Sequence, residues 1–181
     1  MVKRGLITSL LIGSLFLSGC WDRKDVEERV PIINLAIDQG QEDKQYTLSL
    51  AVPNVAKLAG GATAPTPEAI PNVISTPCAT LNKGLEQLQR EVSQQIFLGF
   101  LKVIVISEEL ARQKGLENVL DGLMRTAPFR PLTFLVISKG EAREIIAAAP
   151  KEVAVPFLYQ SEKMRTLSDL EAIPKSYVKD F

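Results

Sequence analysis

Histidine is absent from this sequence, and cysteine and tryptophan are scarce. The 181 residues contain no His, two Cys and one Trp. The chain therefore lacks the side chain that most often serves as a general base and most often binds metal ions. An enzyme built from this sequence would need another, visible set of reactive groups.

An excess of charge of either sign is also missing. The chain carries 21 basic and 21 acidic residues, which gives a formal net charge of zero. Proteins that bind nucleic acid usually show a basic excess that attracts the phosphate backbone. Nothing in the composition points to a nucleic-acid partner.

Catalytic patterns are missing as well. Adjacent residues on a helix point about 100° apart, so Glu108 and Glu109 fit a solvated first turn better than a paired acid and base. Gly60 and Gly61 lack the Gly-Lys-Ser/Thr that completes a phosphate-binding loop. Cys78 has no histidine to activate it, so an idle or buried thiol is expected. No cluster has metal-ligand spacing. The sequence predicts a protein that is not an enzyme and that has no cofactor or metal.

A long uncharged run occurs only near the start of the chain. Lys3 and Arg4 precede residues 5–17 (GLITSLLIGSLFL), which is the layout of an export signal. As a helix this run spans roughly 20 Å, against about 30 Å for the hydrocarbon core of a bilayer. An uncleaved membrane anchor is the alternative, and the short length argues against it.

Cys20 lies where this apolar run ends. Residues 17–20 read Leu-Ser-Gly-Cys, which resembles the lipobox of bacterial lipoproteins. In such proteins the thiol receives a diacylglyceryl group, and cleavage before the cysteine makes it the first mature residue. Two acyl chains anchor a protein stably in a membrane. We therefore expect residues 1–19 to be a lipoprotein signal peptide and Cys20 to be the lipid attachment site, with membrane lipid as its partner.

The mature chain is long enough for one domain. Cleavage before Cys20 leaves 162 residues. Cys78 then has no cysteine with which to form an internal disulfide, so the exported domain relies on its hydrophobic core.

Alternating apolar and polar residues predict two strands near the start of this domain. Residues 30–38 and 45–52 alternate with period two, and a short polar turn joins them, so they predict a hairpin. Residues 53–77 are rich in proline and predict an irregular loop, with a brief strand at 72–76. A variable solvated connection is the expectation for this loop, and a functional or disordered segment is the alternative.

Strands and helices alternate in the second half. Apolar stripes predict helices over residues 80–95, 116–124 and 142–149, and Ser107 is placed to cap a further short helix. Two continuous apolar runs, 102–107 and 132–138, predict strands covered on both faces. The expected fold class is α/β with α+β character: a mixed β-sheet with an N-terminal hairpin and helices packed on it.

Several blocks of sequence resemble one family. Residues 19–28 (GCWDRKDVEE) are similar to the mature start of the Ger(x)C spore germination proteins, the lipoprotein C subunits of nutrient germinant receptors. The similarity continues at Ile37-Asp38, at 98–111 (LGFLKVIVISEELA) and at 135–142 (LVISKGEA). Phe100 stands where the family usually has histidine, so any role of that imidazole is absent here.

This resemblance implies a receptor role without catalysis. Such a subunit sits on the outer surface of the spore inner membrane, anchored through Cys20, and assembles with the A and B subunits. Family members are about twice as long and have three domains. Residues 20–150 are therefore expected to form the N-terminal domain, and residues 151–181 a linker or the start of a truncated second domain. The apolar residues of this tail are scattered, so it is expected to bury little surface.

Two other functions and one local question stay open. A lipid-anchored solute-binding protein of a transporter is one alternative, but it needs two lobes and a cleft. A truncated, non-functional copy is the other. Trp21 suits the lipid interface and a packed position on the domain equally well.

Overall fold

The structure is a computed structural model that describes residues 28–41, 43–53, 72–126, 128–148 and 158–181. The predicted signal peptide, Cys20 and Trp21 lie outside the described residues, as does most of the proline-rich loop. The strands are β1 (Arg29–Pro31), β2 (Asn34–Gln39), β3 (Tyr46–Val52), β4 (Asn72–Cys78), β5 (Gln95–Phe97), β6 (Val103–Ser107) and β7 (Phe134–Ser138). The helices are α3 (Leu81–Glu91), η2 (Leu98–Phe100), α4 (Glu108–Lys114), α5 (Leu116–Thr126), α6 (Ala142–Ala147), α7 (Tyr159–Asp169) and η4 (Val178–Asp180).

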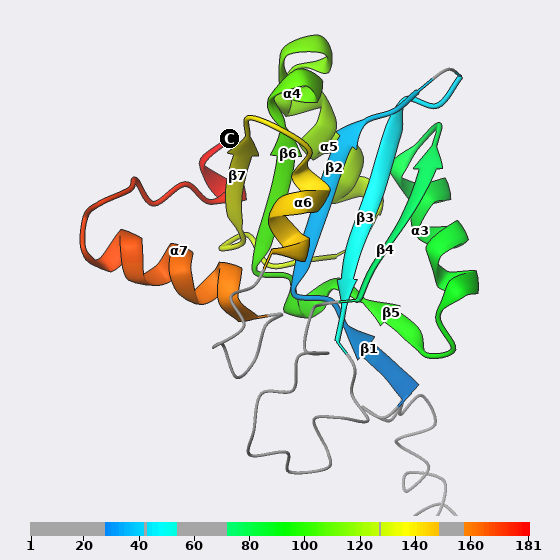
Figure 1. Ribbon diagram of the computed structural model, residues 1–181, viewed down its shortest axis with the longest axis horizontal. Helices are drawn as coiled ribbons and strands as arrows, with labels where there is room; N and C mark the ends of the chain where they lie inside the picture. The colour runs from blue at the N-terminus through cyan, green and yellow to red at the C-terminus, as the bar shows by residue number, and fades with distance from the viewer. Residues whose placement is uncertain (1–27, 42, 54–71, 127, 149–157) are drawn as a thin grey trace, which may run out of the picture.

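A mixed five-stranded sheet forms the centre of the domain, in the order β4-β3-β2-β6-β7 (Figure 1). Strands β2 and β3 are antiparallel neighbours, which confirms the predicted hairpin. Strands β2, β6 and β7 are parallel to one another, which confirms the parallel half of the sheet. Parallel neighbours need crossover connections, and α4 and α5 provide the one between β6 and β7.

Helices cover both faces of this sheet. Successive strand residues point to opposite faces, so Leu35 and Ile37 join one core cluster while Ala36 joins another. The first cluster also holds the apolar stripes of α3, α4 and α5, and the second holds Ala142 and Ile146 of α6. In Figure 1, α6 lies in front of the sheet and α5 behind it. The fold is therefore the expected mixed sheet between helical layers.

Two predicted elements have different boundaries in the structure. The strand predicted at residues 30–38 is two strands, because the chain leaves the main sheet at Ile32, where the backbone N–H donates to the Phe97 carbonyl oxygen (3.1 Å). β1 pairs with β5 in a separate parallel ribbon. The helix predicted at residues 80–95 ends at Glu91, and β5 begins at Gln95.

The two strands expected to be covered on both faces differ. Every residue of β6 is buried, as predicted for a strand between two parallel neighbours. β7 follows β6 in register, but its Ile137 side chain is 43% exposed, so full burial of this run was wrong. The Ile137 side chain is exposed because β7 is the last strand of the five-stranded sheet and helices cover it only in part.

The C-terminal tail buries more surface than its scattered apolar residues predict. Gln160 of α7 donates to the carbonyl oxygens of Ile145 and Ala148, both at 2.6 Å, which ties α7 to α6. Tyr177 forms an antiparallel bridge with Phe134, and Val178 is buried. This segment therefore covers the start of the β7 edge. Residues 149–157 are not described, so the boundary at residue 150 stays a prediction.

In the described part of the chain, no helix combines the length and the apolar character that crossing a bilayer requires.

Candidate functional site

The carboxyl ends of β2, β6 and β7 meet at one end of the sheet, which we call the apical end. Ligands of open α/β sheets usually bind outside the carboxyl ends of the parallel strands. A hollow of about 580 Å³ lies there. Its lining is polar and carries both signs of charge: Asp38, Gln39, Gly40, Gln41, Thr47, Ser75, Ser107, Glu109, Lys139, Gly140, Glu141 and Arg143.

Asp38 is the most buried carboxyl group of this hollow, and the fold already uses it. Its two oxygens accept the backbone N–H groups of Ala142 (2.6 Å) and Arg143 (3.1 Å), so it caps the start of α6. Burial raises the pKa of Asp38 above its ordinary value, while the two N–H donors oppose that rise. The carboxylate therefore positions α6 and is not free to act as a base.

The acidic pair next to it behaves as the sequence predicts. Glu108 accepts a hydrogen bond from Arg112 one turn later (2.6 Å), and Glu109 accepts one from Gln113 (3.2 Å). Both belong to the first turn of α4. Ser107 takes the N-cap position as expected, but its hydroxyl makes no capping hydrogen bond, so the prediction held for position and not for chemistry.

Cys78 is buried inside the domain. Its side chain is 1% exposed, and burial raises the pKa of the thiol, which keeps it protonated and unreactive. The thiol lies against Gly84 of α3, where a Cβ atom would come within 2.7 Å of the sulfur. The expected idle, buried thiol is confirmed. Within the ranges that the structure describes, no three His, Cys, Asp or Glu side chains gather into a group that could hold a metal ion.

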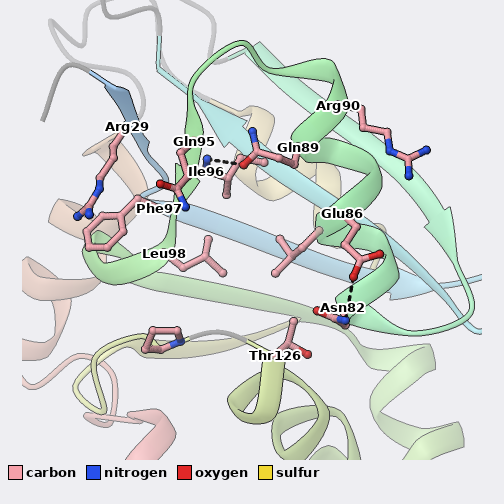
Figure 2. Close-up of a pocket in the computed structure, with 12 residues that line it drawn as sticks. Arg29, Asn82, Glu86, Gln89, Arg90, Gln95, Ile96, Phe97, Leu98 and Thr126 are labelled. Atoms are coloured by element: carbon pink, nitrogen blue, oxygen red, sulfur yellow. Dashed lines mark hydrogen bonds between the residues drawn. The ribbon is translucent and has the colours of Figure 1, made fainter. Parts of the chain in front are cut away.

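A second hollow, of about 740 Å³, lies toward the opposite end of the sheet, which we call the basal end (Figure 2). The basal end carries β1, β5, η2 and the loop before β7 (Figure 1). Helix α3 and the end of α5 complete the walls of the hollow. Its lining residues are Arg29, Asn82, Leu85, Glu86, Gln89, Arg90, Gln95, Ile96, Phe97, Leu98, Thr126 and Pro128.

Gln89 holds the floor of this second hollow together. Its amide group donates to the carbonyl oxygens of Val92 (3.4 Å) and Gln94 (2.8 Å) and accepts the N–H of Ile96 (2.8 Å, Figure 2). One side chain thus fixes the turn between α3 and β5. Sequence reasoning missed this role, because a glutamine on the polar side of a helix carries no signal of it.

Two adjacent aromatic rings lie between two arginine side chains at the basal end. The Arg29 guanidinium lies 4.9 Å from the centre of the Phe97 ring, as Figure 2 shows for this pair. Phe97 meets Phe100 edge to face, with 5.5 Å between ring centres, and Arg130 lies 5.9 Å from the Phe100 ring. Phe100, at the position where the resemblance led us to expect histidine, therefore belongs to a row of rings and guanidinium groups. A phenyl ring has no acid or base function, but its face can hold a cation.

The predicted site residue, Cys20, is not among the described residues, so its lipidation stays a prediction. The first described residue is Glu28, which directly precedes β1 at the basal end. The basal end is therefore the part of the described fold that follows Cys20 most closely in the chain. Among the described residues, neither hollow brings together a nucleophile and a base within hydrogen-bond reach.

Comparison with known proteins identifies the family to which this chain is similar. The family described as "Spore germination protein N-terminal domain" matches residues 22–181. Spore germination protein KC of Bacillus subtilis (strain 168) is 31% identical over 150 residues, which is 81% of this chain and 37% of that protein. Spore germination proteins B3 and A3 of the same organism are 28% and 26% identical, over 85% and 77% of this chain and 39% and 36% of their own lengths.

The chain thus spans less than half of the length of these curated relatives. The search of solved structures found no match. The family match begins two residues after Cys20 and runs through the helical and strand elements described above. This chain belongs to the Ger(x)C family of spore germination proteins, through the N-terminal domain of that family.

Proposed function

We propose that this chain is a lipid-anchored, non-catalytic subunit of a spore nutrient germinant receptor. In this proposal residues 1–19 are the signal peptide, and Cys20 carries the diacylglyceryl group. The domain then lies on the outer surface of the spore inner membrane and works with the A and B subunits of the receptor. Residues 151–181 would lead toward whatever follows the first domain in longer members of the family.

The observation that carries this proposal is the continuity of the lipobox with the family domain. Leu17-Ser18-Gly19-Cys20 ends an apolar run, and the match to the spore germination domain starts at residue 22. A lipid at Cys20 would therefore hold this very domain at a membrane, with no intervening module.

The use of the polar groups supports a binding role. Asp38 caps α6, and Gln89 fixes the α3–β5 turn, so these two polar side chains near the two hollows serve the fold. At the basal end, Phe100, Leu132 and Arg130 stay exposed. Surfaces of this kind recognise partners and lipids.

Mass spectrometry of the mature N-terminus tests the anchor. We expect a diacylglyceryl cysteine at position 20, and we expect Cys20→Ser to leave an unprocessed chain that still carries residues 1–19. A mature N-terminus elsewhere, without lipid, contradicts the anchor.

Copurification tests the receptor role. The tagged, lipidated chain, extracted from spore inner membranes in mild detergent, should bring down the A and B subunits. A tagged lipoprotein with the same residues 1–20 and an unrelated domain is the control. Recovery of A and B with both proteins, or with neither, contradicts a receptor subunit.

A further inference from the structure

The basal end presents a surface made of Arg29, Phe97, Phe100, Lys102, Arg130, Leu132 and Arg165, which we call the basal surface. We infer that the basal surface lies directly on an anionic phospholipid bilayer and that the domain thereby adopts a fixed orientation on the membrane. The inference rests on the proposed function in one respect, namely that Cys20 carries the lipid anchor.

Apolar exposure is the first observation. The Phe100 side chain is 45% exposed and the Leu132 side chain is 62% exposed. Phe100 is the last residue of the short 3-10 helix η2, and Leu132 lies in the loop before β7, so both lie on connections at the basal end (Figure 1). Two separate apolar side chains of this kind suit shallow insertion at the level of the lipid headgroups.

Positive charge surrounds these apolar groups. Lys102, Arg130 and Arg165 are exposed and line one hollow of about 490 Å³ together with Leu132. Glu162 is the only carboxylate in that lining. Long cationic side chains can lay their carbon stems along apolar surface while the charged ends stay with headgroup phosphates.

The row of rings adds a second contact of the same kind. Arg130 covers one side of the row at Phe100, and Arg29 covers the other at Phe97. The row of rings therefore joins the hollow around Leu132 to the start of β1. The basal surface is thus continuous from this hollow to the first described strand.

The number of residues between Cys20 and the first described residue limits the distance between the domain and the membrane. Eight residue steps separate Cys20 from Glu28, and even a fully extended chain covers at most about 29 Å over that distance. The six residues of β2 alone span roughly 20 Å along the sheet. An anchored Cys20 thus keeps Glu28, directly before the start of β1 at the basal end, within about 29 Å of the bilayer.

Charge complementarity favours anionic lipid as the ligand of the basal surface. Each Lys or Arg close to an anionic membrane adds an attraction that corresponds to about a fivefold gain in partitioning. The apolar groups are two separated side chains and not the broad apolar core of a protein–protein interface. Docking of a protein subunit on the same surface is the competing outcome, and the experiment below distinguishes it.

Vesicle binding by the chain from residue 21 onward tests the inference without the anchor. Every described element lies beyond residue 28, so this form retains the described fold. We expect cosedimentation with vesicles of phosphatidylglycerol and phosphatidylcholine (30:70), and loss of binding with phosphatidylcholine alone. Lys102→Gln with Arg130→Gln should weaken binding about 25-fold, because two cations are lost. Phe100→Ser with Leu132→Ser should abolish the binding that survives high salt.

The matched control neutralises one lysine and one arginine at the apical end, Lys139→Gln with Arg143→Gln. This variant should bind vesicles within about twofold of the parent. All substituted side chains are exposed, so unchanged melting curves show that each variant is folded.

Three results overturn the inference: no binding to the anionic vesicles, equal loss in the basal and apical variants, or binding only when the A and B subunits are reconstituted in the vesicles. The last of these assigns the basal surface to a protein partner. A lipidated Cys20 found by mass spectrometry alongside any of these results leaves the proposed function intact and overturns only the orientation.

Discussion

The two ends of the sheet differ in what their side chains are free to do. At the apical end, Asp38 is committed to the start of α6, and the neighbouring carboxylates are paired along α4. At the basal end, Phe100, Leu132 and several cations are exposed. At the end where α/β proteins usually bind small ligands, the buried carboxylate is thus used for a structural contact.

This difference shows how the fold distributes its accessible side chains between the two ends of the sheet. The carboxyl ends of parallel strands attract ligands because helix starts and loops leave polar groups unoccupied there. Here the carboxylate of Asp38, at the end of β2, caps α6 and is no longer free to bind a ligand. The connections at the other end, next to the chain segment that leads from Cys20, then carry the accessible chemistry.

The largest effect on folding is expected from a substitution in the core around β6, because the apical and basal ends both depend on this core. Ile104 is fully buried in β6, so Ile104→Asp should abolish folding, because an unpaired buried charge is very costly. Ile137 lies on the neighbouring strand, opposite Ile106, but its side chain is 43% exposed. Ile137→Asp is therefore the matched control and should express and melt as a folded protein. Cooperative unfolding of the Ile104→Asp chain would show that β6 does not support both ends.

A smaller loss is expected at the contact between α3 and the sheet. Glycine to alanine inside a helix usually stabilises by up to about 1 kcal/mol. At position 84, however, the new Cβ would meet the Cys78 sulfur and a Leu48 methyl group at 2.7 and 3.1 Å. Gly84→Ala should therefore destabilise the domain by about 1–3 kcal/mol in urea unfolding.

The same substitution in a Cys78→Ala background sharpens that prediction. Removing the sulfur relieves the closest contact, so Gly84→Ala should cost less in this background than in the parent. The difference is a coupling energy of about 0.5 kcal/mol or more. Equal costs in the two backgrounds would mean that α3 does not approach β4 as closely as described.

The smallest of the three effects concerns the apical end alone. Asp38→Ala removes the cap of α6 and should lower the free energy of unfolding by about 1–2 kcal/mol. Because the folded-state pKa of Asp38 is raised above its ordinary value of 3.8, the native state binds the proton more tightly than the unfolded state. The stability that Asp38 contributes is then fully present below pH 3.8 and declines as the pH rises through the folded-state pKa.

Urea unfolding from pH 3 to pH 7 measures this decline. The difference in the free energy of unfolding between the parent and Asp38→Ala should be largest at pH 3 and smaller at pH 7. Glu109→Ala, at an exposed position in the lining of the same hollow, is the control and should show little gap at any pH. A gap that widens toward neutral pH would reverse the assigned direction of the pKa shift. Vesicle binding should stay unchanged in Asp38→Ala.

Local patterns were enough to predict the elements that depend on local chemistry. The alternation in residues 45–52 predicted β3 and its hairpin, and the apolar run at 102–107 predicted the fully buried β6. The same reasoning failed for Ile137, because a continuous apolar run does not reveal which strand lies at the edge of a sheet.

Contacts between segments that are distant in the chain could not be predicted from the sequence. Asp38 caps a helix that starts 104 residues later, and no spacing rule connects the two. Tyr177 pairs with Phe134 through backbone groups, which carry no residue-type signal. The cation–ring row likewise depends on η2 and the loop before β7 folding to the same end, so only its members were visible in the sequence.

Depth measurement on the membrane-bound protein compares the two ends most directly. Leu132 and Lys139 lie on either side of β7, about 23 Å apart if the chain between them is extended. Leu132→Cys and Lys139→Cys each add one exposed thiol to a lipid-anchored chain whose own Cys78 is buried, so each can carry a single fluorophore. Vesicles with quenchers on the lipid headgroups should quench the label at position 132 strongly and the label at position 139 weakly. Equal quenching at the two positions, or stronger quenching at 139, would contradict a domain that rests on the membrane through its basal surface.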